Sequence, residues 1–219
     1  MQSPDLTYYA KRYTDATDRW SEGTAPRDSQ IVGRVRQLSE REFTRPLRIL
    51  DVGCGRLGVA FLLKDALDSR VVIDAVDMAH EAITTKHPQL ASRAKSMGID
   101  FRCASVFEFT PAAPYDVVLD IGFFHHIVPA DWPRYRERLS RLLVPDGVLL
   151  LYSFHPNNTH WSRDNGDPSG GGHMRGGYYC HYHTSASLLE AMCGVFESSN
   201  QLFTHQFEEH SAAFHELRR

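Results

Sequence analysis

The sequence lacks long apolar runs, and no stretch approaches the roughly 20 consecutive apolar residues that span a bilayer. Its first residues, Met1–Asp5, are polar and contain no apolar segment typical of an export signal. We therefore expect a cytoplasmic protein that has no membrane partner. Cysteine is also scarce, and the four cysteines are widely scattered. In such a chain they predict reduced thiols rather than a disulfide framework.

An excess of charge of either sign is missing as well. The formal net charge is −3, so no overall positive field attracts nucleic acid, and we expect no nucleic-acid partner. With 219 residues, of which 42% are hydrophobic and 23% charged, the chain fits one well-buried globular domain. Histidine is the abundant exception, with 12 residues that lie mostly in the second half of the chain.

Short apolar runs alternate with helical patterns through the middle of the chain. We predict five strands, at 48–52, 71–77, 100–104, 115–120 and 148–154, with helices at 59–68, 80–97 (interrupted near Pro88) and 132–143. Strands that are apolar on both faces and separated by helices predict an α/β fold with a parallel sheet covered on both sides. Two further strand-like runs, at 196–207 and 211–217, predict a hairpin or an antiparallel edge.

The chain is predicted to be a single domain, 1–219, with four parts. A helical leader occupies 1–45, with helices at about 6–20 and 28–42, and the alternating core spans 46–154. Residues 155–183 are rich in glycine and predict a long loop, which in a compact domain is typical of a lid or a binding loop. Residues 184–219 are expected to form a helix that Thr184 caps, followed by the final strands.

The strongest chemical signal follows the first predicted strand, in the run DVGCG at 51–55. Gly53 and Gly55 allow the backbone to turn sharply and to approach a ligand without a Cβ clash. The spacing also satisfies G-x-G-x-x-G, which could cradle a dinucleotide pyrophosphate. Asp51 favours S-adenosylmethionine (SAM) instead, because its carboxylate could bind a methionyl ammonium and would repel a pyrophosphate. Asp77 ends the second strand, where an acid can accept both ribose hydroxyls.

These segments together resemble the class I SAM-dependent methyltransferases, over roughly residues 46–155. The matching segments are 51–55, 76–77, 115–120 and the run LVPDG at 143–147, which is similar to the L-x-P-G-G turn of that family. The run DIGFFHH at 120–126, followed by Arg134-Tyr135, is similar to small-molecule methyltransferases, including those that methylate thiols and thiopurines. The resemblance implies a Rossmann-like methyltransferase fold, with a doubly wound, mostly parallel sheet of seven strands, an antiparallel C-terminal strand and SAM as cofactor.

The resemblance also implies roles for single residues. Gly53 and Gly55 pack against the methionyl and ribose parts of SAM, Asp77 binds the ribose, and Asp120 lies beneath the sulfonium. Leu57 departs from the family pattern, because a third glycine is common at its position. The cofactor-binding residues that we expect are Asp51, Gly53, Cys54, Gly55, Asp77, Met78, Ser105, Val106, Phe107 and Asp120.

Methyl transfer from a sulfonium is an in-line displacement, so the protein must mainly hold nucleophile, methyl and sulfur in line. A base adds to the rate when the acceptor is a protonated amine or a hydroxyl, and histidine suits this work near neutral pH. Ligands bind at the carboxyl ends of sheet strands, so the segments after the fourth and fifth strands should meet the acceptor. The catalytic candidates are His125, which we prefer, and His126, His155 and Tyr152. The substrate-binding candidates are Tyr9, Tyr13, Trp20, Asn157, His173, Arg175, Tyr178, Tyr179 and His181.

Two features admit more than one interpretation. The leader aromatics, Tyr9 and Tyr13 among them, could form a lid over the acceptor or could pack the leader helix onto the core. Cys180, His181 and His183, with His173 or His155, could bind a metal, since imidazole and thiolate suit zinc or iron. Their spacing matches no specific zinc pattern, and we expect no metal.

The leading hypothesis is an enzyme that moves a methyl group from SAM to N, O or S of a small metabolite, in a biosynthetic pathway. One alternative keeps the fold but opens SAM at another carbon. The amine of SAM would then close a ring such as azetidine-2-carboxylate and release methylthioadenosine. Two others are a nicotinamide oxidoreductase and a SAM-binding protein without catalytic activity. The sequence leaves the acceptor and the oligomeric state open.

Overall fold

The computed structural model of the protein describes residues 6–15, 25–41, 45–84, 89–157, 170–175, 178–207 and 210–219. The chain divides into two compact units, Met1–Tyr115 and Asp116–Arg219. Among the helices of these described residues, none is both long and apolar enough to cross a membrane.

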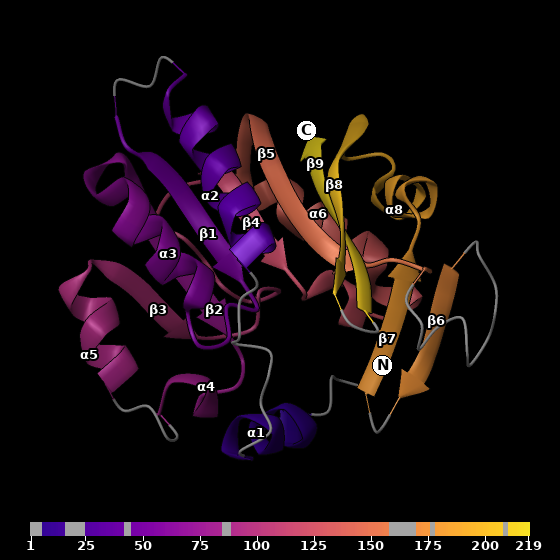
Figure 1. The fold of residues 1–219 in the computed structure, drawn as a ribbon, viewed down its shortest axis with the longest axis horizontal. Coiled ribbons are helices and arrows are strands. Elements are labelled where there is room, and N and C mark those ends of the chain that lie inside the picture. Colours follow the sequence, from indigo (N-terminus) through magenta and orange to yellow (C-terminus); the bar gives the residue numbers. More distant parts are fainter. Residues whose placement is uncertain are drawn as a thin grey trace. The chain divides into compact units, whose positions relative to one another are not determined.

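Unit 1 is built on three parallel strands, β1 (Leu47–Val52), β2 (Val71–Asp77) and β3 (Ile99–Cys103). Its helices are α1 (Leu6–Thr14), α2 (Ala25–Ser39), α3 (Gly58–Leu67), α4 (Glu81–Thr84) and α5 (Gln89–Ser96), with the short η1 (Asp68–Arg70) before β2. Helices α2 and α3 pack against each other, and α5 contacts β3 (Figure 1). Ile49, Leu50 and Val52 of β1 are all fully buried, as expected for a strand covered on both faces.

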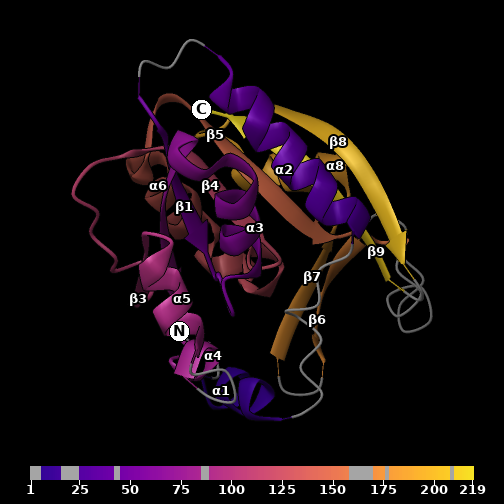
Figure 2. The ribbon, with the colours of Figure 1, turned by 60° about the vertical axis from the view of Figure 1, so that its left-hand side comes forward.

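Unit 2 contains the C-terminal strands. These are β4 (Tyr115–Ile121), which begins at the boundary, β5 (Leu143–Phe154), β8 (Ser198–Phe207) and β9 (His210–Arg218). Strand β9 pairs antiparallel with both β5 and β8. Helices α6 (Trp132–Leu142) and α8 (Ser185–Met192) contact each other, and the short η2 (Phe124–His126) and η3 (Pro129–Asp131) precede α6. Strands β6 (Gly170–Arg175) and β7 (Tyr178–His183) form a separate antiparallel pair (Figure 2).

The strand order of the large sheet is β3-β2-β1-β4-β5-β9-β8. The predicted α/β fold with a seven-stranded mixed sheet is therefore confirmed. At the C-terminal end of the sheet, β9 runs antiparallel to both of its neighbours, β5 and β8. It is the antiparallel C-terminal strand that we expected, and it forms the predicted hairpin with β8. Thr184 caps α8 as predicted, because its side chain accepts the N–H of Ser187 at 3.1 Å.

Two local predictions were wrong. Strand β5 begins at Leu143, so the LVPDG run lies within it and does not precede it. The left-handed backbone of Asp146, with φ 61, makes the bend there, and pairing with β9 starts only at Val148. The glycine-rich segment 155–183, predicted as a loop, contains both β6 and β7, because the glycines of β6 allow the close approach of β7. A Cβ on Gly172 would overlap the ring of Tyr179 across the ladder.

Candidate active site

The loop after β1 in unit 1 is fastened to β2 by its own backbone. The N–H groups of Gly53 and Cys54 both donate to the Val76 carbonyl, at 2.8 and 3.2 Å. Gly53 and Gly55 have φ values of 64 and 51, in the left-handed region that glycine adopts without strain. A Cβ on Gly55 would lie 2.8 Å from Oη of Tyr13. The conformation at Gly55 therefore favours glycine, and a Cβ there would displace the Tyr13 hydroxyl.

Leu57 completes this turn in a conformation that is unusual for leucine. Its φ is 63, and it directly precedes α3. A left-handed backbone costs a residue with a Cβ roughly 1–2 kcal/mol. The Leu57 side chain is fully buried, and burying a leucine contributes about 1.5–3 kcal/mol. Burial of the side chain therefore offsets the backbone strain at the position where the family commonly has glycine.

Asp77 is tied to the glycine loop by its carboxylate. Oδ2 accepts the N–H of Gly55 at 2.9 Å, and Oδ1 accepts the N–H of Ala79 at 2.8 Å. Burial raises the pKa of Asp77 above its ordinary value, although these N–H donors lower it. Each carboxylate oxygen has a second lone pair, so Asp77 retains acceptor capacity for a pair of hydroxyl groups.

Two carboxylates lie near the thiol of Cys54. Burial raises the pKa of Cys54 well above its ordinary value, and the negative charges of Asp51 and Asp77 raise it further. Cys54 is therefore protonated and a poor nucleophile. Asp51 itself is buried, with 2% of its surface exposed. This concentration of negative charge around one loop suits a cationic ligand and disfavours a pyrophosphate.

Arg56 is a residue of this loop for which the sequence predicts no role. It is buried, and its Nη2 donates to the Tyr13 carbonyl at 2.9 Å while Nη1 donates to the Ala82 carbonyl at 3.3 Å. Its guanidinium carbon also lies 5.5 Å from the centroid of the Tyr13 ring. Arg56 thus fastens α1 and α4 to the loop, which is the packing interpretation of the leader. A single arginine beside a glycine gives no pattern from which this could be predicted.

The segments expected to line the adenine lie together in unit 1. The Sγ atom of Cys103, at the end of β3, is 3.5 Å from the Met78 carbonyl after β2. Ser105 turns the chain after β3, and its Oγ accepts the N–H of Phe107 at 3.3 Å. Val106 is buried, whereas Met78, Ser105 and Phe107 remain partly exposed. The structure thus brings these predicted residues together, and their contact with adenine stays a prediction.

Asp120 is the penultimate residue of β4 in unit 2, and it organises the turn that follows the strand. It is fully buried, and it accepts the Tyr135 hydroxyl at 2.7 Å and the N–H groups of Phe123 and Phe124 at 2.9 Å each. Burial raises the pKa of Asp120 to about 6, although the three donors lower it. These hydrogen bonds fix the turn that carries His125. The expected contact of Asp120 with SAM stays a prediction.

His125 and His126 lie in η2, within this turn. Their ring centroids are 4.2 Å apart with the planes at 64°, and His125 stacks on Phe154 at 4.4 Å. Nδ1 of His126 lies 2.8 Å from the Tyr179 carbonyl. Burial lowers the pKa of His125 well below its ordinary value and that of His126 to about 4. Both imidazoles are therefore neutral, weakly basic groups at neutral pH.

Strand β7 places a second row of polar rings in unit 2. The Tyr179 hydroxyl is 2.8 Å from Nδ1 of His181, and burial lowers the pKa of His181 to about 4. His181 and His183 stack at 4.3 Å, and Trp132 packs edge-on to His181 at 4.8 Å. Tyr178 packs edge-on to His126 at 5.3 Å, so both η2 and β7 contribute to this cluster.

The other residues predicted for the site are described here by their own contacts and burial. His155 follows β5, and its Nδ1 accepts the N–H of Asn157 at 3.2 Å, while burial lowers its pKa. Tyr152 is buried in β5. Tyr9 packs edge-on to Tyr8 in α1, at 5.4 Å. Trp20 and the side chain of Arg175 lie outside the described residues.

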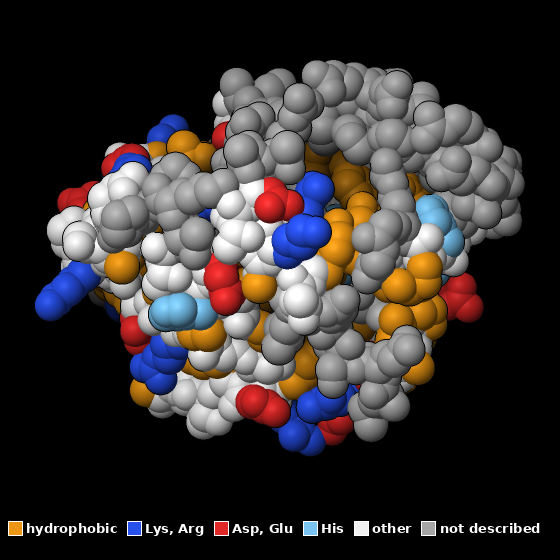
Figure 3. Space-filling view, turned by 90° about the horizontal axis from the view of Figure 1, so that it is seen from below, with side chains coloured by type: hydrophobic (Ala, Val, Ile, Leu, Met, Phe, Trp, Pro, Cys, Tyr) orange, Lys and Arg blue, Asp and Glu red, His pale blue; other side chains and the backbone are white. Residues whose placement is uncertain are grey.

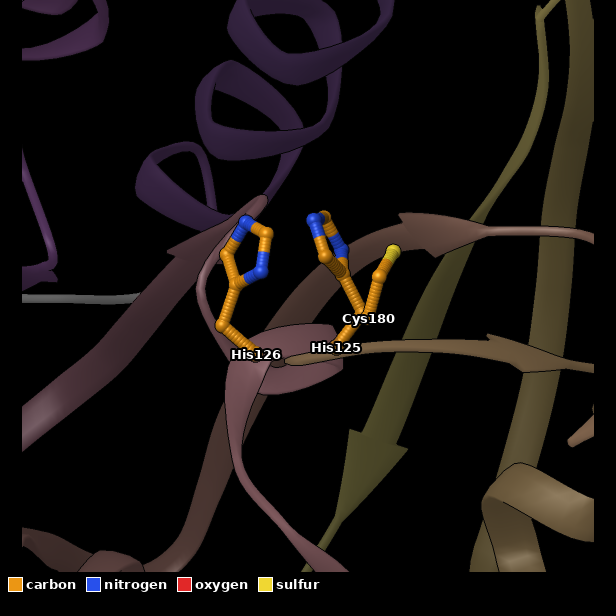
Figure 4. A group of neighbouring side chains, drawn as sticks. All are labelled: His125, His126 and Cys180. Atoms are coloured by element: carbon orange, nitrogen blue, oxygen red, sulfur yellow. The ribbon is translucent and has the colours of Figure 1, made fainter. Parts of the chain in front are cut away.

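The side chains that could bind a metal in this structure are not the set that the sequence suggested. His125, His126 and Cys180 each offer one ligand atom, and these atoms all lie within 4.8 Å of one another (Figure 4). The sequence grouped Cys180 with His181 and His183. Alternation along β7 sends those two imidazoles to the opposite face from the thiol, so this grouping was wrong.

The comparisons with known proteins agree with this arrangement. Residues 49–147 match the family described as "Methyltransferase domain". The match covers just under half of the chain. The resemblance stated from the sequence is therefore confirmed, and the matched residues contain the glycine loop, Asp77, Asp120 and both histidines of η2.

Among curated relatives, the domain is similar to a ubiquinone biosynthesis O-methyltransferase of Bradyrhizobium diazoefficiens. The two are 27% identical over 135 residues, which cover 58% of this chain and 51% of the relative. A probable thiol methyltransferase 2 of Arabidopsis thaliana is 25% identical over 136 residues, covering 62% and 59%. The chain thus spans about half the length of the curated relatives it matches.

Solved methyltransferases share the fold of this domain at low sequence identity. The 1,6-didemethyltoxoflavin-N1-methyltransferase of Burkholderia thailandensis aligns with a TM-score of 0.73 at 21% identity, covering 100% of this chain and 91% of that one. Magnesium protoporphyrin IX methyltransferase from Synechocystis aligns with a TM-score of 0.69 at 16% identity, covering 98% and 99%. These similarities show the fold.

Proposed function

We propose that this protein is a SAM-dependent methyltransferase that moves the sulfonium methyl group to N, O or S of a small metabolite. One observation carries the proposal: Asp51 and Asp77, at the ends of the first two strands, both lie near the thiol of Cys54 in the glycine loop. SAM carries positive charge on its sulfonium and on its ammonium. The carboxylates that would repel a dinucleotide pyrophosphate attract this ligand.

Each unit has a part in the proposal. In unit 1, Asp51 binds the methionyl ammonium and Asp77 binds the ribose hydroxyls, while Gly53 and Gly55 let the backbone approach the ligand. Met78, Ser105, Val106 and Phe107 surround the adenine. In unit 2, the rings of η2 and β7 contact the acceptor. Relatives named for ubiquinone biosynthesis, thiols and a toxoflavin precursor support an acceptor of small size.

The acceptor residues of unit 2 favour an acceptor that is already nucleophilic. His125 and His126 are neutral, and burial lowers the pKa of both. They can accept a hydrogen bond and orient the acceptor, but as weak bases they remove a proton poorly. On the face drawn in Figure 3, the Lys and Arg side chains of the described residues are interspersed with Asp and Glu. This mixture gives no support to a polyanionic substrate.

Binding of SAM is tested by isothermal titration of the full chain with SAM and, separately, with NAD. We expect SAM alone to bind, and Asp77→Ala to weaken SAM at least tenfold, about 1.4 kcal/mol. The matched control is Asp65→Ala, which removes a carboxylate from the exposed side of α3, where Asp65 pairs with Arg93. Unchanged SAM affinity in Asp77→Ala would contradict the ribose contact, and tight binding of NAD would contradict the choice of cofactor.

The reaction is tested by product identity. The protein is incubated with SAM alone and with SAM plus a panel of small thiols, phenols and amines. We expect S-adenosylhomocysteine only when an acceptor is present. Methylthioadenosine formed from SAM alone would instead show that SAM is itself the substrate. Binding of SAM without any turnover across the panel would favour a protein that binds SAM without catalysis.

A further inference from the structure

The group His125, His126 and Cys180 lies entirely in unit 2, between η2 and β7. Its three ligand atoms lie within 4.8 Å of one another, and His125 and Cys180 are 4% and 0% exposed. Tetrahedral zinc, with bonds of about 2.0–2.3 Å, sets its ligands roughly 3.3–3.8 Å apart. Binding one ion would therefore require side-chain rotations that bring the donor atoms closer together.

The hydrogen bond at His126 defines which of its nitrogens can bind. A carbonyl only accepts, so Nδ1 of His126, 2.8 Å from the Tyr179 carbonyl, must carry the proton. The lone pair of the imidazole is then on Nε2. Metal-binding histidines usually donate their other N–H to a carbonyl or a carboxylate in this way, which fixes the orientation of the ring.

His125 supplies an independent observation. Its Nδ1 is buried and makes no hydrogen bond with any residue that the structure describes. A buried polar atom left unsatisfied costs about 1–3 kcal/mol. Its surroundings are ring faces, since it stacks on Phe154 at 4.4 Å and packs against His126 at 4.2 Å. A bound cation is one partner that could reach such an atom.

We propose that His125, His126 and Cys180 bind one thiophilic divalent transition-metal ion of the zinc class. Two imidazoles and one thiolate are soft or borderline ligands, which select zinc over magnesium or calcium. Three protein ligands leave one tetrahedral position open, as in catalytic rather than structural zinc sites. The site differs from the expectation of no metal, because the thiol is grouped with histidines more than 50 residues earlier in the chain. The site does not depend on the binding of SAM. While the ion is bound, the lone pairs of His125 and His126 are on the metal, so an acceptor would meet the open position of the ion instead of the two imidazoles.

Co²⁺ tests the proposed site, because its charge-transfer absorption band appears only when a thiolate, here that of Cys180, binds the ion. The full chain, treated with a chelator and kept reduced, is titrated with Co²⁺ and followed by absorption. We expect one equivalent to bind with a thiolate-to-cobalt charge-transfer band, and Zn²⁺ to displace it. Cys180→Ala should abolish the band and weaken Zn²⁺ at least tenfold. The matched control, Cys193→Ala, removes an exposed thiol from the same unit and should leave the band unchanged.

A second variant keeps the test decisive if the Cys180 variant does not fold. His126→Asn retains a side-chain donor near the position of Nδ1 and removes Nε2, so Co²⁺ affinity should fall at least tenfold while the urea transition is retained. The proposal is overturned if no stoichiometric uptake occurs, if the band persists in Cys180→Ala, or if it disappears in Cys193→Ala. SAM titration of the metal-free chain is measured separately, so failure of this site and failure of the proposed methyltransferase are distinguishable.

Discussion

His215 should make the stability of this protein sensitive to mild acid. The residue lies in β9, in register with Leu151 of β5 and Gln201 of β8, and only 1% of its surface is exposed. Burial, and to a smaller extent the neighbouring His155, lower the pKa of His215 from an ordinary value of 6.5 to about 4. The folded protein therefore holds this imidazole neutral over a range of pH in which the unfolded chain binds a proton.

The sign and size of the effect follow from this difference. The contribution of His215 is fully present above pH 6.5 and is lost as the pH falls from 6.5 toward 4, because only the unfolded chain gains a proton there. One pKa unit corresponds to about 1.4 kcal/mol, so the whole loss is about 3 kcal/mol. Between pH 7.5 and pH 5.0 the loss is about 2 kcal/mol, a large part of a typical folding free energy.

Urea unfolding at pH 7.5 and pH 5.0, with a chelator present, measures this loss. His215→Phe keeps a buried ring in β9 and cannot titrate, so its free energy of unfolding should fall about 2 kcal/mol less than that of the unaltered protein. Leu217→Val is the control, because it changes apolar packing on the same face of β9 and should lower stability by about 1 kcal/mol at both pH values. An equal acid-induced loss in His215→Phe and in the unaltered protein would refute the reasoning.

Three further substitutions test contacts in unit 2. Tyr135→Phe removes the hydroxyl that donates to buried Asp120, and should lower the free energy of unfolding by about 1–3 kcal/mol in urea. Thr184→Ala removes the cap of α8 and should cost about 1 kcal/mol, measured in the same way. Gly172→Ala places a methyl group against the ring of Tyr179, so the near-ultraviolet circular dichroism of the tyrosines should change; an unchanged spectrum would contradict the packing of the β6–β7 pair.

The elements predicted well are those whose signal is local. Strand β2 has the predicted bounds, Val71–Asp77, because every second residue from Val71 to Ala75 is buried and the acid marks its end. The glycine loop could also be predicted from the sequence. Gly53 and Gly55 have positive φ, a conformation that glycine adopts without strain. Such signals arise from single residues and their nearest neighbours, and they need no knowledge of tertiary structure.

The parts that could not be predicted depend on partners distant in sequence. Half of the residues of β6 are glycines, which have low strand propensity, and the strand forms because β7 pairs with it. Arg56 binds the Tyr13 carbonyl, 43 residues away. The grouping of Cys180 with His126 also depends on where η2 meets β7. No spacing rule along the chain gives such contacts, although alternation along β7 already separates Cys180 from His181.

The pKa values of the buried titratable groups near η2 indicate the kind of environment that unit 2 provides for a ligand. Burial raises the pKa of Asp120 to about 6 and lowers that of His126 to about 4. An ion pair between an acid and an imidazole would move both values in the opposite directions. The turn is therefore held by directional hydrogen bonds to Asp120 and surrounded by neutral rings. Such surroundings suit the proposed reaction. The sulfonium loses its positive charge as the methyl group leaves, and a neutral acceptor gains that charge. In the transition state the charge is shared between the sulfur and the acceptor, and no new charge is formed.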